Sequence, residues 1–423
     1  NNSATASTGD CLGGALHVSM ASEVATTVTI SDSSKFSSNS CTTDALSFGG
    51  AFALGIYSLV SADINVTIED STFDANSISG EGVYGGQVYL DSADEITISD
   101  SSFSNGTATA TTGSQAYGGA ISFDAVAAVS ISKSSFTDNT VTSSASSAGS
   151  YGGALCFCEG FVSMELGDIA ISQSVFSGNT ATATGSSSGA FGGGIYTDEI
   201  DSIAITNSTI SGNKASGASK SLGGGLFVKE LDADDNLDGM KLSFVTIANN
   251  SVSGATTNTG GGFYSEHSVA TSQSYAFINV LIADNSSTGT SPDCSSSDSI
   301  QSYGYNLLEI ITGCTFEYAT SGADVATDIT KQDPGLYSLA DNGGSTKTLA
   351  IDSSSVAADA GTCSDLDGNT VTVDQRDYER DASNCDIGAF EYSEADYSVD
   401  EDSYDFEDSD SSKLGGIPTA IKK

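Results

Sequence analysis

Positive charge is scarce in this chain of 423 residues: 13 Lys and Arg stand against 55 Asp and Glu, which gives a formal net charge of −42. Phosphate recognition requires clustered Lys and Arg, so we expect no nucleic-acid partner, and no attraction to anionic membranes for the same reason. No apolar run reaches the ~18 residues that a membrane-spanning helix needs. The chain begins at Asn1 without Met or a signal peptide, as expected for a mature secreted protein.

Tryptophan is absent, there are three prolines, and only 16% of the residues are charged. Gly, Ser, Thr and Ala fill much of the chain instead, and this composition disfavours helices and suits short strands joined by tight turns. The eight cysteines are an even number, which indicates disulfides and an oxidising compartment. We therefore expect an extracellular or cell-surface location.

An internal repeat is the strongest signal in the sequence. Gly-Gly pairs recur at steps of 31 to 40 residues, beginning at positions 13, 49, 85, 118, 152, 192, 223 and 260. A second motif, an aromatic or Ile residue followed three positions later by Asn, lies between the pairs and ends at Asn39, Asn76, Asn139, Asn179, Asn213, Asn250 and Asn285. One copy is irregular, since Asn105 follows Phe103 one position early.

The residues before each Asn alternate between polar and apolar, as in Val129-Ser-Ile131-Ser. This period of two predicts strands that are buried on one face. Each unit is too small to bury its apolar face alone, so the units stack. We predict an all-β fold, a right-handed parallel β-helix of about eight coils with about three short strands per coil. Glycine suits its corners, and the recurring Asn side chains suit a buried hydrogen-bonded ladder.

The Gly-Gly-Ala-(Ile/Leu) and Phe-x-x-Asn motifs resemble the repeats of polymorphic outer-membrane and adhesin-type β-helix proteins over roughly residues 11–290. Beyond residue 291, motifs such as Asp374-Gln375-Arg376 and Cys385-Asp386-Ile387-Gly388 are similar to the choice-of-anchor Q domain. That resemblance implies a module at 291–392 that closes the end of the β-helix formed by residues 1–290. Residues 377–380 and 353–355 depart from the domain's usual pattern. Within the module, Asp374, Arg376 and Glu391 form either a buried ion-pair network or a surface cluster.

The module-like region and its close cysteine spacing predict the disulfides Cys294–Cys314 and Cys363–Cys385, each closing a loop of about 20 residues worth ~3 kcal/mol in the chain-entropy model. Cys11 and Cys41 lie one coil apart and could staple the N-terminal turn. Cys156 and Cys158 lie on one strand face. They form a local disulfide, bonds to other chains, or two buried thiols.

Asn-x-Ser/Thr sequons predict outward glycans at Asn65, Asn105, Asn207 and Asn249. The sequon at Asn285 coincides with a ladder position, so its amide is expected inside the turn.

Two further acidic groups were considered as chemical sites. Asp234, Asn236 and Asp238 match the start of a Ca²⁺-binding loop, but the closing Glu is missing because Val245 stands there. The alternative is a solvated acidic loop, and no other cofactor is indicated. Asp198, Glu199 and Asp201 could supply carboxylates for glycosidic cleavage, but no basic residue lies near them in the sequence. We therefore expect no enzyme activity.

Three classes of function remain. A glycosylated structural protein, self-assembling into a filament or surface layer, is favoured by the small uncharged residues. Assembly would involve residues 393–423, where nine acids occupy 17 positions of 394–410. The alternative is an adhesin or carbohydrate-binding solenoid, which a groove lined by aromatics among the 16 Tyr and 18 Phe would indicate. A polysaccharide lyase or hydrolase would need acids clustered with Lys or Arg.

Overall fold

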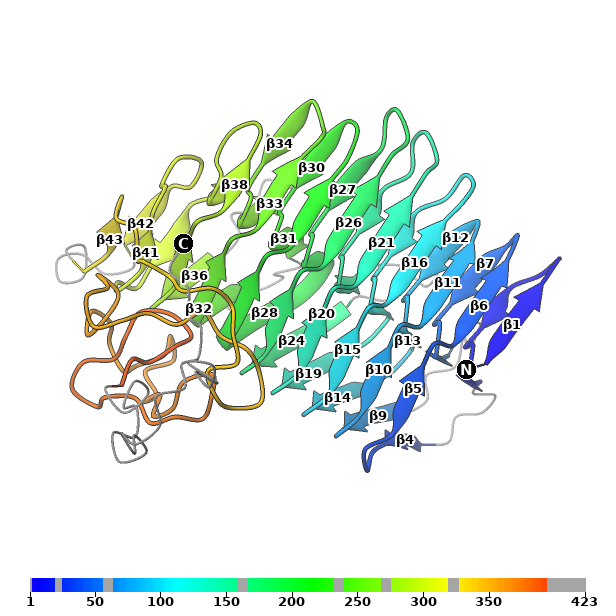
Figure 1. The fold of residues 1–423 in the computed structure, drawn as a ribbon, viewed down its shortest axis with the longest axis horizontal. Helices are drawn as coiled ribbons and strands as arrows, with labels where there is room; N and C mark the ends of the chain where they lie inside the picture. Colours follow the sequence, from blue (N-terminus) through cyan, green and yellow to red (C-terminus); the bar gives the residue numbers. More distant parts are fainter. Residues whose placement is uncertain are drawn as a thin grey trace, which may run out of the picture.

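The computed structural model describes residues 2–19, 25–55, 64–158, 166–231, 239–267, 275–318 and 327–393. Over these ranges the regular structure consists of parallel β-strands, without any helix. The coils stack from β1 at one end to β43 at the other (Figure 1). The predicted all-β parallel solenoid is confirmed.

Three sheets run the length of the stack. The nine-stranded sheet contains β1 (Ser3–Ala6), β6 (Ser40–Thr43), β11 (Ser77–Gly80), β16 (Thr107–Ala110), β21 (Thr140–Ser143), β26 (Thr180–Ala183), β29 (Lys214–Ser216), β33 (Ser251–Ser253) and β38 (Ser286–Ser287). The eight-stranded sheet contains β2 (Cys11–Leu12), β7 (Leu46–Phe48), β12 (Gly82–Tyr84), β17 (Ala116–Tyr117), β22 (Ser150–Tyr151), β27 (Gly189–Phe191), β30 (Lys220–Leu222) and β34 (Thr257–Thr259).

The large sheet has 26 strands in three rows. Its first row contains β3 (Leu16–Val18), β8 (Phe52–Leu54), β13 (Val88–Asp91), β18 (Ile121–Asp124), β23 (Leu155–Phe157), the start of β28 (Ile195–Ser211), β31 (Leu226–Leu231), β35 (Phe263–Glu266) and β39 (Cys294–Ser296). The second row contains β4 (Thr26–Ile30), β9 (Ile64–Glu69), β14 (Glu95–Ser99), β19 (Ala128–Ser132), β24 (Leu166–Ser172), the middle of β28, the start of β32 (Met240–Ala248), β36 (Tyr275–Ile278), β40 (Ile300–Ser302) and β42 (Phe316–Tyr318). The third row contains β5 (Lys35–Ser37), β10 (Thr72–Asp74), β15 (Ser102–Ser104), β20 (Ser135–Thr137), β25 (Val175–Ser177), the ends of β28 and β32, β37 (Leu281–Ala283), β41 (Leu307–Leu308) and β43 (Ile329–Thr330).

A full coil therefore contains five short strands, not three; β6 to β10 form one such coil. One of the two additional strands results from a bend between the second and third rows. There the single strand expected across Val129–Phe136 is divided at Lys133, whose φ is 47°. Each Gly-Gly pair directly follows one strand of the eight-stranded sheet, and the stack makes about seven turns.

The Gly-Gly corner excludes side chains for two different reasons, as Gly152 and Gly153 show. Gly152 has a φ of 64°, which L-residues other than glycine rarely adopt. A Cβ on Gly153 would collide with the carbonyl oxygen of Gly193 in the next coil. The first glycine permits the turn, and the second permits close approach of successive coils.

The interior differs between its two sides. Under the large sheet, rows of Ile and Phe form the main core, and Phe103, Phe136 and Phe176 stack with ring centroids 4.8–5.0 Å apart. Between the nine- and eight-stranded sheets the core consists mostly of small residues such as Ala108, Ala181 and Ala215. Bulky rows therefore support the wide side of the coil, and alanines allow the two narrow sheets to approach.

Buried asparagines form a ladder at the corner that precedes the nine-stranded sheet. The backbone N–H and the Nδ2 of Asn139 both donate to Oδ1 of Asn179, at 3.0 and 2.9 Å. The same pair of bonds continues from Asn179 to Asn213, Asn250 and Asn285. Asn39 and Asn76 are joined in the same way nearer the N-terminus.

The ladder is interrupted where the sequence is irregular, because Gly106 occupies the position of the expected asparagine. Gln87, from a different corner of the coil, fills the gap. Its Oε1 accepts a bond from Asn76, at 3.0 Å, and its Nε2 donates to Oδ1 of Asn139, at 2.9 Å. The two halves of the ladder are thus connected through one glutamine.

A serine ladder lies at the bend between the second and third rows. Each backbone N–H donates to the hydroxyl of the serine one coil further on, at 3.1–3.2 Å, and each hydroxyl donates to a carbonyl two residues before it. The members are Ser71, Ser101, Ser134, Ser174 and Ser208, and all are buried. Because these hydroxyls satisfy backbone donors at a bend, the large sheet can turn without leaving buried polar groups unpaired.

The C-terminal segment, residues 331–393, has no strand and lies against the side of the stack, in front of β28 and β32 (Figure 1). It contacts one equivalent corner position in five successive coils: Lys133, Gln173, Asn207, Phe244 and Asn279. The closing of the solenoid's end by residues 291–392, which the resemblance implies, stays a prediction. The segment contacts the side of the stack, where Lys133, Gln173, Asn207 and Asn279 offer polar groups and Phe244 offers an aromatic ring.

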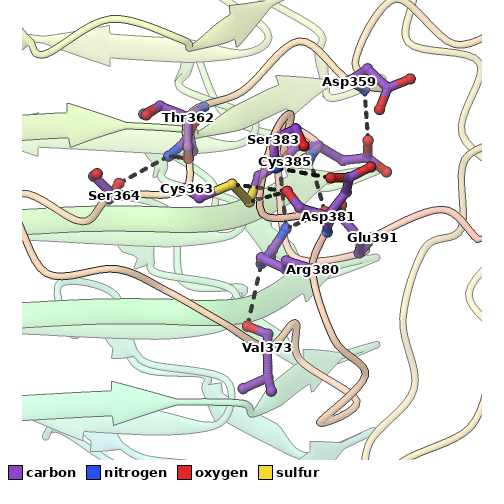
Figure 2. The surroundings of a disulfide bond; sticks show 12 residues. Asp359, Thr362, Cys363, Ser364, Val373, Arg380, Asp381, Ser383, Cys385 and Glu391 are labelled. Carbon is purple, nitrogen blue, oxygen red and sulfur yellow. Dashed lines mark hydrogen bonds and ion pairs between the residues drawn. A yellow bond between two sulfur atoms is a disulfide. The ribbon is translucent and has the colours of Figure 1, made fainter.

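Arg380 anchors this segment. Its guanidinium donates to Glu391 at 2.9 Å and to Oδ1 of Asn207 at 3.0 Å, and it lies 4.1 Å from the ring centroid of Phe244. Arg376 pairs with Asp374 at 2.8 Å, also fully buried. Figure 2 shows Arg380 between Val373 and the loop that carries Cys385 and Glu391. Arg380 lies in the stretch that departs from the domain pattern, yet it makes the central contact.

Four disulfides join Cys11–Cys41, Cys156–Cys158, Cys294–Cys314 and Cys363–Cys385. Of the alternatives left open for Cys156 and Cys158, the structure has the local bond. The four bonds indicate an oxidising environment.

Candidate functional site

Most of the residues proposed from the sequence have structural or surface positions. Asp234, Asn236 and Asp238 lie outside the described residues, as does the tail from residue 394. In the described ranges, no group of three or more His, Cys, Asp or Glu side chains could hold a metal ion. The seven predicted ladder asparagines are brought together at one corner, and the row ends at Asp293, whose carboxylate accepts bonds from the N–H and Nδ2 of Asn285.

The four proposed glycosylation sites differ in exposure. Asn65 and Asn105 are exposed, and Asn249 is partly exposed. Asn207 is a correction: it is 8% exposed, and its amide donates to the carbonyl of Val373 and accepts from Arg380. The C-terminal segment covers this sequon, so a glycan cannot be attached in the folded state.

A row of aromatic rings follows the outer surface just before the Gly-Gly corner. Successive rings stack with centroids 5.0–5.1 Å apart and planes within 13–22° of parallel, in the order Phe48, Tyr84, Tyr117, Tyr151 and Phe191. Each ring ends one strand of the eight-stranded sheet, so the in-register pairing of these strands produces the row. The row forms one wall of a groove.

The opposite wall comes from the first row of the large sheet, on the other side of the corner. Tyr196, Phe227 and Tyr264 are neighbours in register and meet edge to face, with interplanar angles of 84°. Tyr196 also contacts Tyr151 edge to face, at 4.9 Å between centroids, so the two rows of rings pack together at this point. With Cys156 and Cys158, these rings form an apolar cluster outside the main core.

An ion pair lies in this groove. Lys229 donates to both carboxylate oxygens of Asp198, at 2.8 and 2.9 Å, and the hydroxyl of Tyr196 donates to the same carboxylate at 3.0 Å. Burial raises the pKa of Asp198 above its ordinary value, and the hydrogen bond from Lys229 opposes that shift. Burial also raises the pKa of Tyr151 to about 12, so its hydroxyl stays protonated at neutral pH.

The groove deepens into a cavity of about 360 Å³. Polar groups and rings converge there, and the lining includes Gln115, Tyr117, Tyr151, Phe191, Tyr196, Asp198, Lys220, Phe227, Lys229 and Glu266. A cavity that combines aromatic rings with placed polar groups suits a small or extended organic ligand. We regard it as the candidate functional site.

Sequence reasoning missed this site, although both signals were present. An aromatic residue directly precedes the Gly-Gly pairs at 49, 85, 118, 152 and 192. The basic partner of Asp198 is not a neighbour in the sequence, so proximity along the chain does not predict it. Lys229 lies 31 residues further, which equals the step between the Gly-Gly pairs at 192 and 223 and therefore places it beside Asp198 in the next coil.

Comparisons with known proteins give no assignment: no family model, no curated protein and no solved structure matches this chain. Within the described residues, no helix has the length and apolar character needed to cross a bilayer.

Proposed function

We propose that this protein is an extracellular glycan-binding solenoid and that the aromatic groove is its binding site. The observation that carries the proposal is the convergence of aromatic rings with hydroxyl, carboxylate and ammonium groups in one cavity. A groove lined by aromatic residues is the feature that, from the sequence, would favour carbohydrate binding over a purely structural role.

Carbohydrates suit this lining because they have both apolar and polar surfaces. Their C–H groups can lie against Phe191 and Phe227, while their hydroxyls can bond to phenols and to the Asp198–Lys229 pair. The pair is already charge-compensated, so its remaining donor and acceptor capacity is available to neutral hydroxyl groups. Tyr151 makes ring contacts with Tyr117, Phe191 and Tyr196, which fix the position of its ring in the cavity lining.

The experiment is a binding screen of the full-length protein against an immobilised panel of neutral and acidic oligosaccharides, followed by calorimetry on the best ligand. Tyr151→Ala should reduce affinity by at least roughly tenfold, because it removes a central wall residue. Tyr318→Ala, which changes a 39% exposed tyrosine outside the groove, is the matched control and should bind like the wild type. Absence of binding to every glycan, or equal binding by both variants, would contradict the proposal.

A structural subunit of a filament or surface layer is the second candidate. It is supported by the continuous hydrogen bonding along the stack: two side-chain ladders and three parallel sheets favour a stiff rod. The proposed assembly segment begins at residue 393 and lies almost entirely outside the described residues.

Electron microscopy of the intact chain and of a chain truncated after Tyr392 tests this second candidate. Polymers formed only by the intact chain would support it. A strictly monomeric intact protein, over a range of salt and Ca²⁺ concentrations, would count against it.

A further inference from the structure

We propose that the groove binds a linear, uncharged polysaccharide in an extended conformation, lying parallel to the solenoid axis with one sugar unit per coil. This inference rests on the proposed glycan-binding function and specifies its ligand class. It depends on three features of the groove: the orientation of the rings, their spacing and the local charge.

The ring row does not offer its faces to a ligand. Tyr84, Tyr117 and Tyr151 stack on one another with interplanar angles of 19° and 18°, so each ring face is covered by a neighbour. The edges of Tyr117 and Tyr151 therefore border the cavity. A ligand at this wall meets phenol edges and not ring faces. The hydroxyl of Tyr117 donates to Gln115 and can still accept a bond, while the hydroxyl of Tyr151 borders the cavity and can bond to a ligand hydroxyl.

The spacing of this line is set by the coil repeat. Centroids lie 5.0 Å apart between Tyr84 and Tyr117 and 5.1 Å apart between Tyr117 and Tyr151. This distance is close to the length of one pyranose unit in an extended β-linked chain. An extended β-1,4-linked glycan along the axis would thus place one sugar unit at each coil, with the same face turned to the wall at every second coil, whereas a compact or helical glycan would lose the match after one coil.

The row changes character at its far end. Phe191 follows Tyr151 at 5.1 Å but has no hydroxyl, and Leu222 follows Phe191 in strand register. Across the groove, the hydroxyl of Tyr196 already donates to Asp198. Hydroxyl recognition therefore ends near Tyr151, and the next unit meets an apolar edge.

The charge of the groove favours an uncharged chain. Two lysines, Lys220 and Lys229, are balanced in the cavity lining by Asp198 and Glu266. The whole chain carries a net charge of −42, which repels a polyanion over distances comparable to the Debye length. No excess of positive charge in the cavity offsets that repulsion.

Calorimetry with oligosaccharides of increasing length tests this inference on the full-length protein. The probes are β-1,4-linked glucose, N-acetylglucosamine, xylose and mannose series, with oligogalacturonate and alginate oligomers as anionic series. We expect affinity for one neutral series to rise with each added unit until the ligand spans the coils that line the cavity, from Tyr117 to Phe227, and then to level off. Anionic oligomers of the same length should bind more weakly.

Tyr151→Phe removes one hydroxyl and keeps the stacked ring, so the variant should keep the wild-type melting temperature. Its affinity for the longest neutral ligand should fall roughly 3- to 10-fold, the effect of one hydrogen bond, while its affinity for the monosaccharide changes less. Tyr318→Phe is the control outside the groove and should show no loss.

Some outcomes separate this inference from the proposed function. Equal affinity for a disaccharide and a hexasaccharide, preference for an anionic series, or no effect of Tyr151→Phe would overturn the lengthwise neutral chain while leaving glycan binding intact. Absence of binding to all series would overturn both.

Discussion

The solenoid and the C-terminal segment are stabilised in opposite ways. In the solenoid the same contact recurs once per coil, between asparagines, between serines and between stacked rings. In the segment no contact recurs, and the guanidinium of Arg380 alone donates to five acceptors. A repeated contact divides the stabilisation among neighbours, whereas a unique one concentrates it in a few side chains. The comparison predicts which substitutions act locally and which release a whole region.

The largest effect should come from Arg380→Met. The change leaves the buried Glu391 carboxylate without its cation and removes the bond to Asn207, which should destabilise the docked segment by about 3–5 kcal/mol. Limited proteolysis followed by mass spectrometry should show cleavage within residues 331–393, while the coils around Asn179 stay protected. Arg380→Lys keeps the positive charge but not the planar guanidinium. Its rate of cleavage within residues 331–393 should lie between those of Arg380→Met and the wild type. Loss of the solenoid together with the segment would show that the two regions are not independent.

Asn179→Ala should have the next largest effect, this time on the solenoid. It leaves the N–H and Nδ2 of Asn139 without their shared acceptor in a fully buried corner, at a cost of about 1–3 kcal/mol. Chemical denaturation monitored by circular dichroism measures the change. Asn65→Ala, at an exposed position on β9, is the control and should be near neutral. An unchanged free energy of unfolding in Asn179→Ala would mean that water replaces the lost Oδ1 acceptor.

The two regions should also differ in pH dependence. Burial, and then the nearby Glu391, raise the pKa of Asp386 to about 7, above its ordinary value of 3.8. A carboxyl with a raised pKa in the folded state stabilises that state in acid, and this contribution is lost as the pH rises from 3.8 to about 7. Hydrogen exchange, corrected for intrinsic rates, should therefore show weaker protection of the segment at pH 8 than at pH 5, with little change around Asn179. Asp386→Asn should reduce the difference in protection between pH 5 and pH 8. Greater protection of the wild-type segment at pH 8 than at pH 5 would contradict the prediction.

Lys133→Ala should have the smallest effect, although it also removes a contact between segment and solenoid. Lys133 and Asp377 form an ion pair at 2.7 Å, but their side chains are 34% and 49% exposed, so the pair contributes about 0–1 kcal/mol. Protease release of the segment should be nearly unchanged and should become slightly more sensitive to salt. If Lys133→Ala reduced the stability of the docked segment as much as Arg380→Met does, the row of corner contacts would act as one cooperative unit.

The repeat made the solenoid predictable, because one period in the sequence corresponds to one coil. The Gly-Gly pairs mark the end of each strand of the eight-stranded sheet, and the alternation before Phe136 marks the strands of the large sheet. The serine ladder was equally visible, since Ser101 and Ser134 each lie two positions before a stacked phenylalanine, but hydroxyl residues are so common in this chain that the recurrence was not noticed.

The position of the C-terminal segment could not be predicted in this way. No period relates Arg380 to Asn207 or Phe244, since the contacts join residues that are 173 and 136 positions apart. The resemblance to an end module does not indicate which side chains meet, because the contacts with the side of the stack depend on long-range complementarity between unique side chains. The burial of Asn207 was unpredictable for the same reason. Its sequon indicates a surface position, and only the docked C-terminal segment covers it.

The lateral segment also has a consequence for how this protein can change in length. Repeat arrays grow and shrink by gain or loss of whole units, and a solenoid alone would tolerate this anywhere along its axis. Here the C-terminal segment contacts corner positions from Lys133 to Asn279. A coil added between those positions would shift some of these contact residues along the axis relative to their partners in the segment. Duplication should be tolerated before Lys133 and should be destabilising between Lys133 and Asn279. Melting curves of two variants, one with a coil duplicated before Lys133 and one with a coil duplicated after it, would show whether the C-terminal segment limits the number of coils that it spans.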